Sequence, residues 1–137
     1  MEKEFVTYEQ ALALKELGFD EYCLGLYSYA SRNTIDMQHV IHTCKASSKL
    51  IWMRVPTPTF SQAFRWFREK YSLLNHLTTH LNPYGEDGAL EESYGYRIMF
   101  NKDGWKCDVW EELIFDSYGE AELACLAKLI EIAKEMI

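Results

Sequence analysis

Thr59-Phe60-Ser61-Gln62-Ala63 has the pattern of a helix start, and the same layout recurs at Thr7-Tyr8-Glu9-Gln10-Ala11 and at Ser117-Tyr118-Gly119-Glu120-Ala121. Each stretch has a hydroxyl residue, an aromatic residue next to it, Gln or Glu three places after the hydroxyl, and then Ala. In a capping box the hydroxyl accepts from the third helical N–H, and the Gln or Glu side chain returns to the N-cap N–H. The segments between the three stretches do not match, so the pattern indicates three independently capped helices rather than a sequence repeat.

The three predicted helices differ in where they end. The first runs over 8–17 and stops at Gly18, which supplies a left-handed C-cap. The second runs over 60–71, and the third runs from Tyr118 to the end of the sequence. Apolar residues of the second helix fall at helical spacing and form one stripe: Phe60, Ala63, Phe64, Phe67 and Tyr71.

The third predicted helix is apolar around more than half of its circumference, whereas a helix on one side of a sheet needs only about a 100° stripe. Several of its apolar residues have no obvious cover: Leu123, Leu126, Ile130, Ala133 and Ile137. Soluble monomers rarely show large apolar patches, so we expect the first helix, the segment 30–48 or a second chain to cover them. Two-fold dimers are the commonest oligomers, and a homodimer is therefore favoured.

Strand-like segments lie between the predicted helices. The segment 94–101 leads through Lys102-Asp103-Gly104 into 105–110, which predicts a hairpin. Further strands are expected at 22–29 and 50–55, with a weaker one within 73–81, and loops are expected at 30–48 and 82–93. The sequence thus predicts a single α+β domain over 1–137, with three capped helices packed on an antiparallel sheet of three to five strands in the order α-β-β-α-(β)-β-β-α.

Composition narrows the classes of function. The chain has 137 residues, 48% of them hydrophobic, and a net charge of −7. This acidic balance argues against non-specific nucleic-acid binding, which needs a surplus of Lys and Arg. The opening residues resemble no signal peptide, and no apolar run is long enough to span a membrane. We therefore expect a cytoplasmic protein without membrane attachment.

Three stretches of this chain resemble a family of small uncharacterised proteins from gut bacteria and from their phages and mobile elements. The stretches are 4–21, 58–71 and 117–132, which include the three predicted helices. The family carries no established activity, so the resemblance implies a setting rather than a site. Small accessory proteins of phages and mobile elements more often bind a host component than take part in core metabolism.

Two groups of histidines have the spacing of metal ligands. His39, His42 and Cys44 offer three ligand types, but no fourth ligand stands at a standard zinc spacing. His76 and His80 fall on one face of either a helix or a strand, but no second basic or hydroxyl partner stands at matching spacing. We predict no metal and no cofactor, and a small histidine-based hydrolase or metal-dependent enzyme is the alternative reading.

Tryptophan and arginine residues provide the candidate binding site: Trp52, Arg54, Arg65, Trp66 and Arg68. These two residue types are the most enriched in binding hot spots, Trp stacks on flat ligands and Arg pairs with phosphates. The competing interpretation is that the tryptophans complete the core and the arginines are solvated. The sequence favours a non-enzymatic binding protein, an inhibitor or a sequestering protein, acting on a host protein or a small nucleotide signal.

Overall fold

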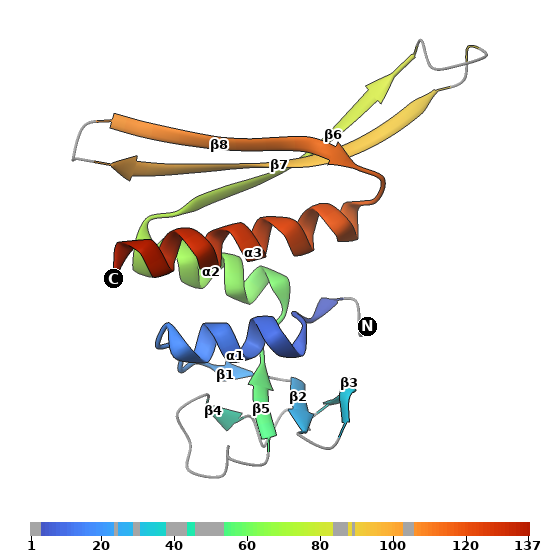
Figure 1. Cartoon of the computed structure of the whole chain (residues 1–137). Helices are drawn as coiled ribbons and strands as arrows, with labels where there is room; N and C mark the ends of the chain where they lie inside the picture. The colour runs from blue at the N-terminus through green and yellow to red at the C-terminus, as the bar shows by residue number, and fades with distance from the viewer. Residues whose placement is uncertain are drawn as a thin grey trace. The chain divides into compact units, whose positions relative to one another are not determined.

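The computed structural model describes residues 4–23, 25–28, 31–37, 44–45, 54–83, 88, 90–102 and 106–137 (Figure 1). Its elements follow the order α1-β1-β2-β3-β4-β5-α2-β6-β7-β8-α3. They divide into two compact units, of which unit 1 is Met1–Trp66 with Ile130–Ile137, and unit 2 is Phe67–Leu129. The three helices and the antiparallel strands confirm the predicted α+β class.

All three helices begin where the sequence predicts. They are α1 (Tyr8–Glu16), α2 (Phe60–Tyr71) and α3 (Tyr118–Met136). At α1 the capping box is complete, because Thr7 Oγ1 accepts from the Gln10 N–H and Gln10 Oε1 accepts from the Thr7 N–H, each at 3.2 Å. This reciprocal pair fixes the entry of the chain into α1.

At the other two N-caps the hydroxyl accepts the expected hydrogen bond, but the Gln62 and Glu120 side chains bond to other groups instead of the N-cap N–H. Thr59 Oγ1 accepts from the Gln62 N–H, and Ser117 Oγ accepts from the Glu120 N–H, both at 3.2 Å. The Glu120 carboxylate accepts from the Asp116 N–H at 3.3 Å, one residue before the N-cap. The Gln62 side chain leaves its helix and joins the cluster described below.

The first helix ends as predicted at Gly18, which has φ 95°. The Gly18 N–H donates to the Lys15 carbonyl and the Phe19 N–H donates to the Leu14 carbonyl, both at 3.0 Å. This is the Schellman arrangement, which needs a left-handed residue after the helix. Phe19 and Leu14 are both buried, so the helix end also places Phe19 in the core.

Five strands of unit 1 form two small antiparallel sheets. The strands are β1 (Tyr22–Cys23), β2 (Gly25–Ser28), β3 (Ser31–Met37), β4 (Cys44–Lys45) and β5 (Arg54–Thr57). One sheet has the order β3-β2-β5, and the other pairs β1 with β4.

The predicted loop over 30–48 is wrong in part, because it contains β3 and β4. The segment Ser31–Met37 has no alternation of apolar and polar residues that would indicate a strand. It is a strand because it pairs with β2, where Tyr27 stands opposite Ile35 and Leu26 opposite Asp36. Tertiary pairing of this kind overrides local propensity.

The strand expected over 50–55 lies mostly outside the described residues. Of its six residues the structure describes Arg54 and Val55, which open β5. The strand continues to Thr57 through Pro56, which is opposite Leu26. Among the described strands β5 lies at the edge of its sheet, which is a position where proline is tolerated.

Unit 2 contains the predicted antiparallel sheet. Its strands are β6 (Leu74–Asn82), β7 (Glu91–Lys102) and β8 (Lys106–Phe115), in the order β6-β7-β8. The weaker strand within 73–81 and the hairpin are both confirmed. The predicted loop over 82–93 is too long at both ends, because the pairing of β6 with β7 continues to Asn82 and Glu91.

A β-bulge interrupts the pairing of β7 with β8. Tyr94 is opposite Phe115 and Tyr96 is opposite Glu112, so two residues of β8, Leu113 and Ile114, face the single Gly95 of β7. Bulges of this type bend a strand and change the direction in which a side chain points.

Each unit has its own buried apolar residues. In unit 1, α1 packs against β5, and the Val6 N–H donates to the Pro58 carbonyl at 3.1 Å. The buried side chains of unit 1 include Val6, Leu14, Phe19, Val55, Ala63 and Trp66. Those of unit 2 include Phe67, Leu73, Tyr96, Ile98, Leu126 and Leu129.

The cover that we expected for the apolar face of the third helix is present within the chain for three of its five residues. Leu126, Ile130 and Ala133 are buried within the single chain, while Leu123 and Ile137 are exposed. The width of the apolar stripe therefore reflects burial within the chain. Dimerisation stays a prediction, but it no longer has this helix as its reason.

Candidate functional site

Trp66, one of the predicted binding residues, belongs to the core of unit 1. Its side chain is only 6% exposed. The indole packs edge-to-face on Phe19, with ring centroids 5.4 Å apart and an interplanar angle of 75°. This geometry is favourable for aromatic pairs. The competing interpretation of this tryptophan, that it completes the core, therefore holds.

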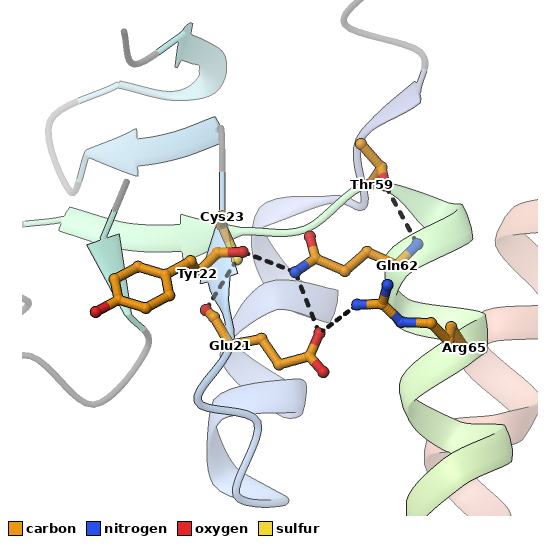
Figure 2. Close-up of polar contacts among 6 residues, drawn as sticks. All are labelled: Glu21, Tyr22, Cys23, Thr59, Gln62 and Arg65. Carbon is orange, nitrogen blue, oxygen red and sulfur yellow. Dashed lines mark hydrogen bonds and ion pairs between the residues drawn. The ribbon is translucent and has the colours of Figure 1, made fainter. Parts of the chain in front are cut away.

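Arg65 lies on the exposed side of α2 and pairs with a residue that sequence reasoning did not single out. Its guanidinium is 3.0 Å from the carboxylate of Glu21, just before β1 (Figure 2). The same oxygen of Glu21 accepts from the Gln62 side-chain amide at 3.2 Å. We call these three residues the Glu21 cluster.

The Glu21 cluster ties β1 to the first turns of α2. Gln62 Nε2 also donates to the Tyr22 carbonyl oxygen at 2.7 Å, and the Gln62 N–H donates to Thr59 Oγ1 (Figure 2). Gln62 thus spans from the N-cap of its own helix to a strand 40 residues earlier in the chain. The charged groups of Arg65 and Glu21 pair with each other within unit 1, and the Gln62 amide bonds to Glu21 and Tyr22. The cluster therefore has a structural role, which is to connect two elements of unit 1.

Three predicted binding residues remain, and the structure describes them to different extents. Arg68 is exposed on α2. Arg54 is the first residue of β5, opposite Ser28 in the register, and Trp52 lies outside the described residues. Of the predicted residues whose side chains the structure describes, Trp66 is in the core and Arg65 pairs with Glu21, so these two do not form a shared binding surface.

The two histidines predicted to share a face are on β6, and both are exposed. His76 is opposite Arg97 and His80 is opposite Ser93 of β7. Arg97 in turn pairs with Glu111 of β8 at 3.1 Å. Among the described residues, no group of three or more His, Cys, Asp or Glu side chains has an arrangement that would hold a metal ion.

The second histidine group cannot be placed in the same way. His39 and His42 lie outside the described residues. Cys44, the third member of that group, begins β4, where its backbone is opposite Cys23 of β1.

Ile114 is the surface feature that sequence reasoning missed. It lies in the β-bulge of β8 and is 85% exposed. Four residues later, Tyr118 opens α3 and is 49% exposed. The sequence carries a signal for this, because Leu113-Ile114-Phe115 puts three apolar residues in succession where a half-buried strand would alternate.

Tyr118 is held by a short chain of aromatic and polar contacts. Its ring meets Tyr94 edge-to-face, with centroids 6.4 Å apart. The Tyr94 hydroxyl donates to the Glu92 carboxylate at 2.9 Å, and this hydrogen bond raises the pKa of Tyr94 above its ordinary value. Ile114 near the end of β8 and Tyr118 at the start of α3 are both exposed, and we call these two residues the Ile114 corner.

Over the described residues, no helix has the length and apolar character that a membrane span requires. Compared with protein-family models, with curated proteins and with solved structures, the chain matches none.

Proposed function

We propose that the protein is a non-enzymatic binding protein that acts on a host protein, as an inhibitor or as a sequestering protein. One observation carries the proposal, the 85% exposure of Ile114 in a β-bulge. A regular strand would turn alternate side chains to opposite faces. The bulge instead inserts one residue and leaves the large aliphatic side chain of Ile114 in solvent. An exposed side chain of this kind is suited to contact a partner protein.

The Ile114 corner fits the physics of protein recognition. The burial of exposed apolar groups against a partner stabilises the complex, by roughly 25 cal/mol per Å² of apolar surface. Tyrosine is among the residues most enriched in hot spots. The contacts of Tyr118 with Tyr94, and of Tyr94 with Glu92, fix part of the surface before binding. A surface that is ordered beforehand loses less entropy when a partner binds.

A host protein is a better partner for this surface than a small nucleotide. A nucleotide site was expected from tryptophan stacking and arginine pairing, but Trp66 is buried on Phe19 and Arg65 pairs with Glu21. The alternative, a histidine-based hydrolase, would rest on His76 and His80, which are exposed on β6. Among the described residues, we find no contact of either histidine with a carboxylate, which a histidine acting as a general base would be expected to have. The proposed setting in a phage or mobile element rests on the resemblance given above.

The test compares two aspartate substitutions at equally exposed isoleucines. Ile114→Asp places a charge in the Ile114 corner, while Ile137→Asp is the matched control, because Ile137 is 82% exposed at the end of unit 1. Tagged wild type and both variants are used to capture proteins from an extract of the native host, and each captured partner is then purified and titrated.

We expect wild type and Ile137→Asp to bind the same partner, and Ile114→Asp to weaken binding at least tenfold, which is about 1.4 kcal/mol. Binding that Ile114→Asp leaves unchanged would refute the role of the corner. Native mass spectrometry that finds a retained nucleotide and no protein would favour the small-ligand reading instead.

A further inference from the structure

The sheet of unit 2 has an open edge with unusual composition. Within the part of the chain that the structure describes, β6 pairs with β7 on one side and with no strand on the other. An edge strand presents unpaired N–H and C=O groups, which form a template for another strand. The nine residues of β6, Leu-Asn-His-Leu-Thr-Thr-His-Leu-Asn, include no proline, no lysine and no acidic residue. These are the residues by which proteins normally block such an edge.

The opposite edge of the same sheet shows what a blocked edge looks like. The sequence of β8 is Lys-Cys-Asp-Val-Trp-Glu-Glu-Leu-Ile-Phe, with four charged residues, and a β-bulge interrupts it near its end. Charges and bulges both discourage edge-to-edge pairing. The two edges therefore differ in the features that control association, and β6 is the one that is left able to pair.

We propose that β6 pairs antiparallel with β6 of a second copy of this chain, across a two-fold axis at Thr78. In antiparallel pairing, residues that are directly opposite share a face of the sheet. The two-fold axis is perpendicular to the sheet, so each residue points to the same face in both copies. Residues that are opposite must therefore be an even number of positions apart, which places the axis at a residue and not between two residues. Thr78 is the middle residue of Leu74–Asn82, and only an axis at Thr78 pairs all nine residues of β6.

The side chains that meet in this register are compatible. His76 of one copy is opposite His80 of the other, and Leu77 is opposite Thr79. Opposite like charges destabilise a sheet, and β6 contains no lysine, arginine, aspartate or glutamate. The chain as a whole carries a net charge of −7, so two copies approach most easily along an uncharged segment.

Thr78 itself supplies a second, independent observation. Its Oγ1 is buried and has no hydrogen-bond partner among the described residues. A buried hydroxyl without a partner costs free energy. Across the proposed axis two Thr78 side chains are opposite each other, and after rotation about χ1 their hydroxyls can bond to one another, as cross-strand threonine pairs do.

The first test is the mass of the full chain in solution. Light scattering at micromolar concentration should give twice the 16.1 kDa chain mass for wild type. Thr78→Lys places two ammonium groups face to face at the axis, and lysine is tolerated on a monomeric edge strand, so this variant should have the monomer mass. Ile114→Lys is the matched control on the other edge strand and should keep the dimer mass, whatever it does to host-protein binding.

The second test fixes the register. With the axis at Thr78, oxidation of Thr78→Cys should give a covalent dimer, because the two Cβ atoms face each other at a distance near that of a disulfide. Thr79→Cys should give far less, since Thr79 faces Leu77 of the second copy.

A monomer mass for wild type would refute the proposal, as would a dimer that Thr78→Lys does not disturb. Cross-linking of Thr79→Cys in place of Thr78→Cys would refute the register. Capture of a different protein on β6, with wild type monomeric in its absence, would assign the edge to that partner and would also overturn the inference. None of these results depends on the function proposed for the Ile114 corner.

Discussion

The side-chain amide of Gln62 donates to the backbone carbonyl of Tyr22 at 2.7 Å, although Gln62 stands where a capping box would return it to its own helix. Gln10, at the same place in α1, does return to Thr7. The two glutamines therefore have equivalent sequence positions and different structural roles.

We expect Gln62→Ala to destabilise the protein by about 1–2 kcal/mol, because it removes bonds to the Tyr22 carbonyl and to the Glu21 carboxylate, and bonds to charged groups are the stronger ones. Gln10→Ala removes one neutral bond and should cost about 0.5–1 kcal/mol. Urea unfolding of both variants beside wild type makes the comparison. Equal or reversed costs would show that the connection from α2 to β1 contributes no more to stability than the capping bond of Gln10.

The N-cap of α2 gives a prediction about stability. Thr59→Ala removes the hydroxyl that accepts from the Gln62 N–H and should cost about 1 kcal/mol, as lost N-caps typically do. The variant is compared with wild type by chemical denaturation. A cost below roughly 0.3 kcal/mol would mean that this hydroxyl does not cap the helix.

Trp66 should behave as a core residue and not as a binding residue. Trp66→Ala removes a buried indole that packs on Phe19, and cavities left by large aromatic side chains cost about 3–5 kcal/mol. Trp66→Phe keeps an aromatic ring against Phe19 and should cost less. Thermal and urea unfolding measure both. A loss of ligand or partner binding by a stable Trp66→Ala would support the surface role that the sequence suggested.

Cys125 makes stability depend on alkaline pH. Burial, with a smaller effect from Glu122, raises the pKa of the Cys125 thiol from 9.0 to about 12. Between these values the unfolded chain loses the proton while the folded chain keeps it, so stability is intact below pH 9.0 and falls as pH rises toward about 12.

The comparison of wild type with Cys125→Ala isolates this effect, because the other alkaline groups titrate in both proteins. Wild type should lose stability faster with rising pH, by at most about 1.4 kcal/mol per pH unit. Parallel curves for the two proteins above pH 9.0 would contradict the raised pKa. Thiol labelling of the native protein at pH 8 should be slow at Cys125, since the thiolate is the reactive form.

The parts of the fold that the sequence predicted are those governed by local chemistry. Thr7, Thr59 and Ser117 cap their helices whatever the rest of the chain does, and Gly18 ends α1 because it accepts a positive φ. The hairpin of β7 and β8 follows from the turn between two β-prone segments.

The parts that the sequence did not predict depend on contacts between distant segments. Ser31–Met37 becomes a strand through pairing with β2, and Gln62 changes partner because Glu21 and Tyr22 lie close to it in space. Trp66 is not among the residues of the stripe predicted for the second helix, yet it is buried and packs on Phe19, which is distant in the sequence. His76 and His80 were predicted to share a face of either a helix or a strand, and they are four residues apart on the strand β6, as that prediction allows.

Unit 2 is one continuous segment, Phe67–Leu129, whereas unit 1 combines an early part of the chain with Ile130–Ile137. Unit 1 therefore closes a loop that holds the whole of unit 2 when Ile130, Ile132 and Ala133 join its buried side chains. Loop closure costs entropy, and contacts between residues far apart in the sequence slow folding, so unit 1 should form more slowly than unit 2.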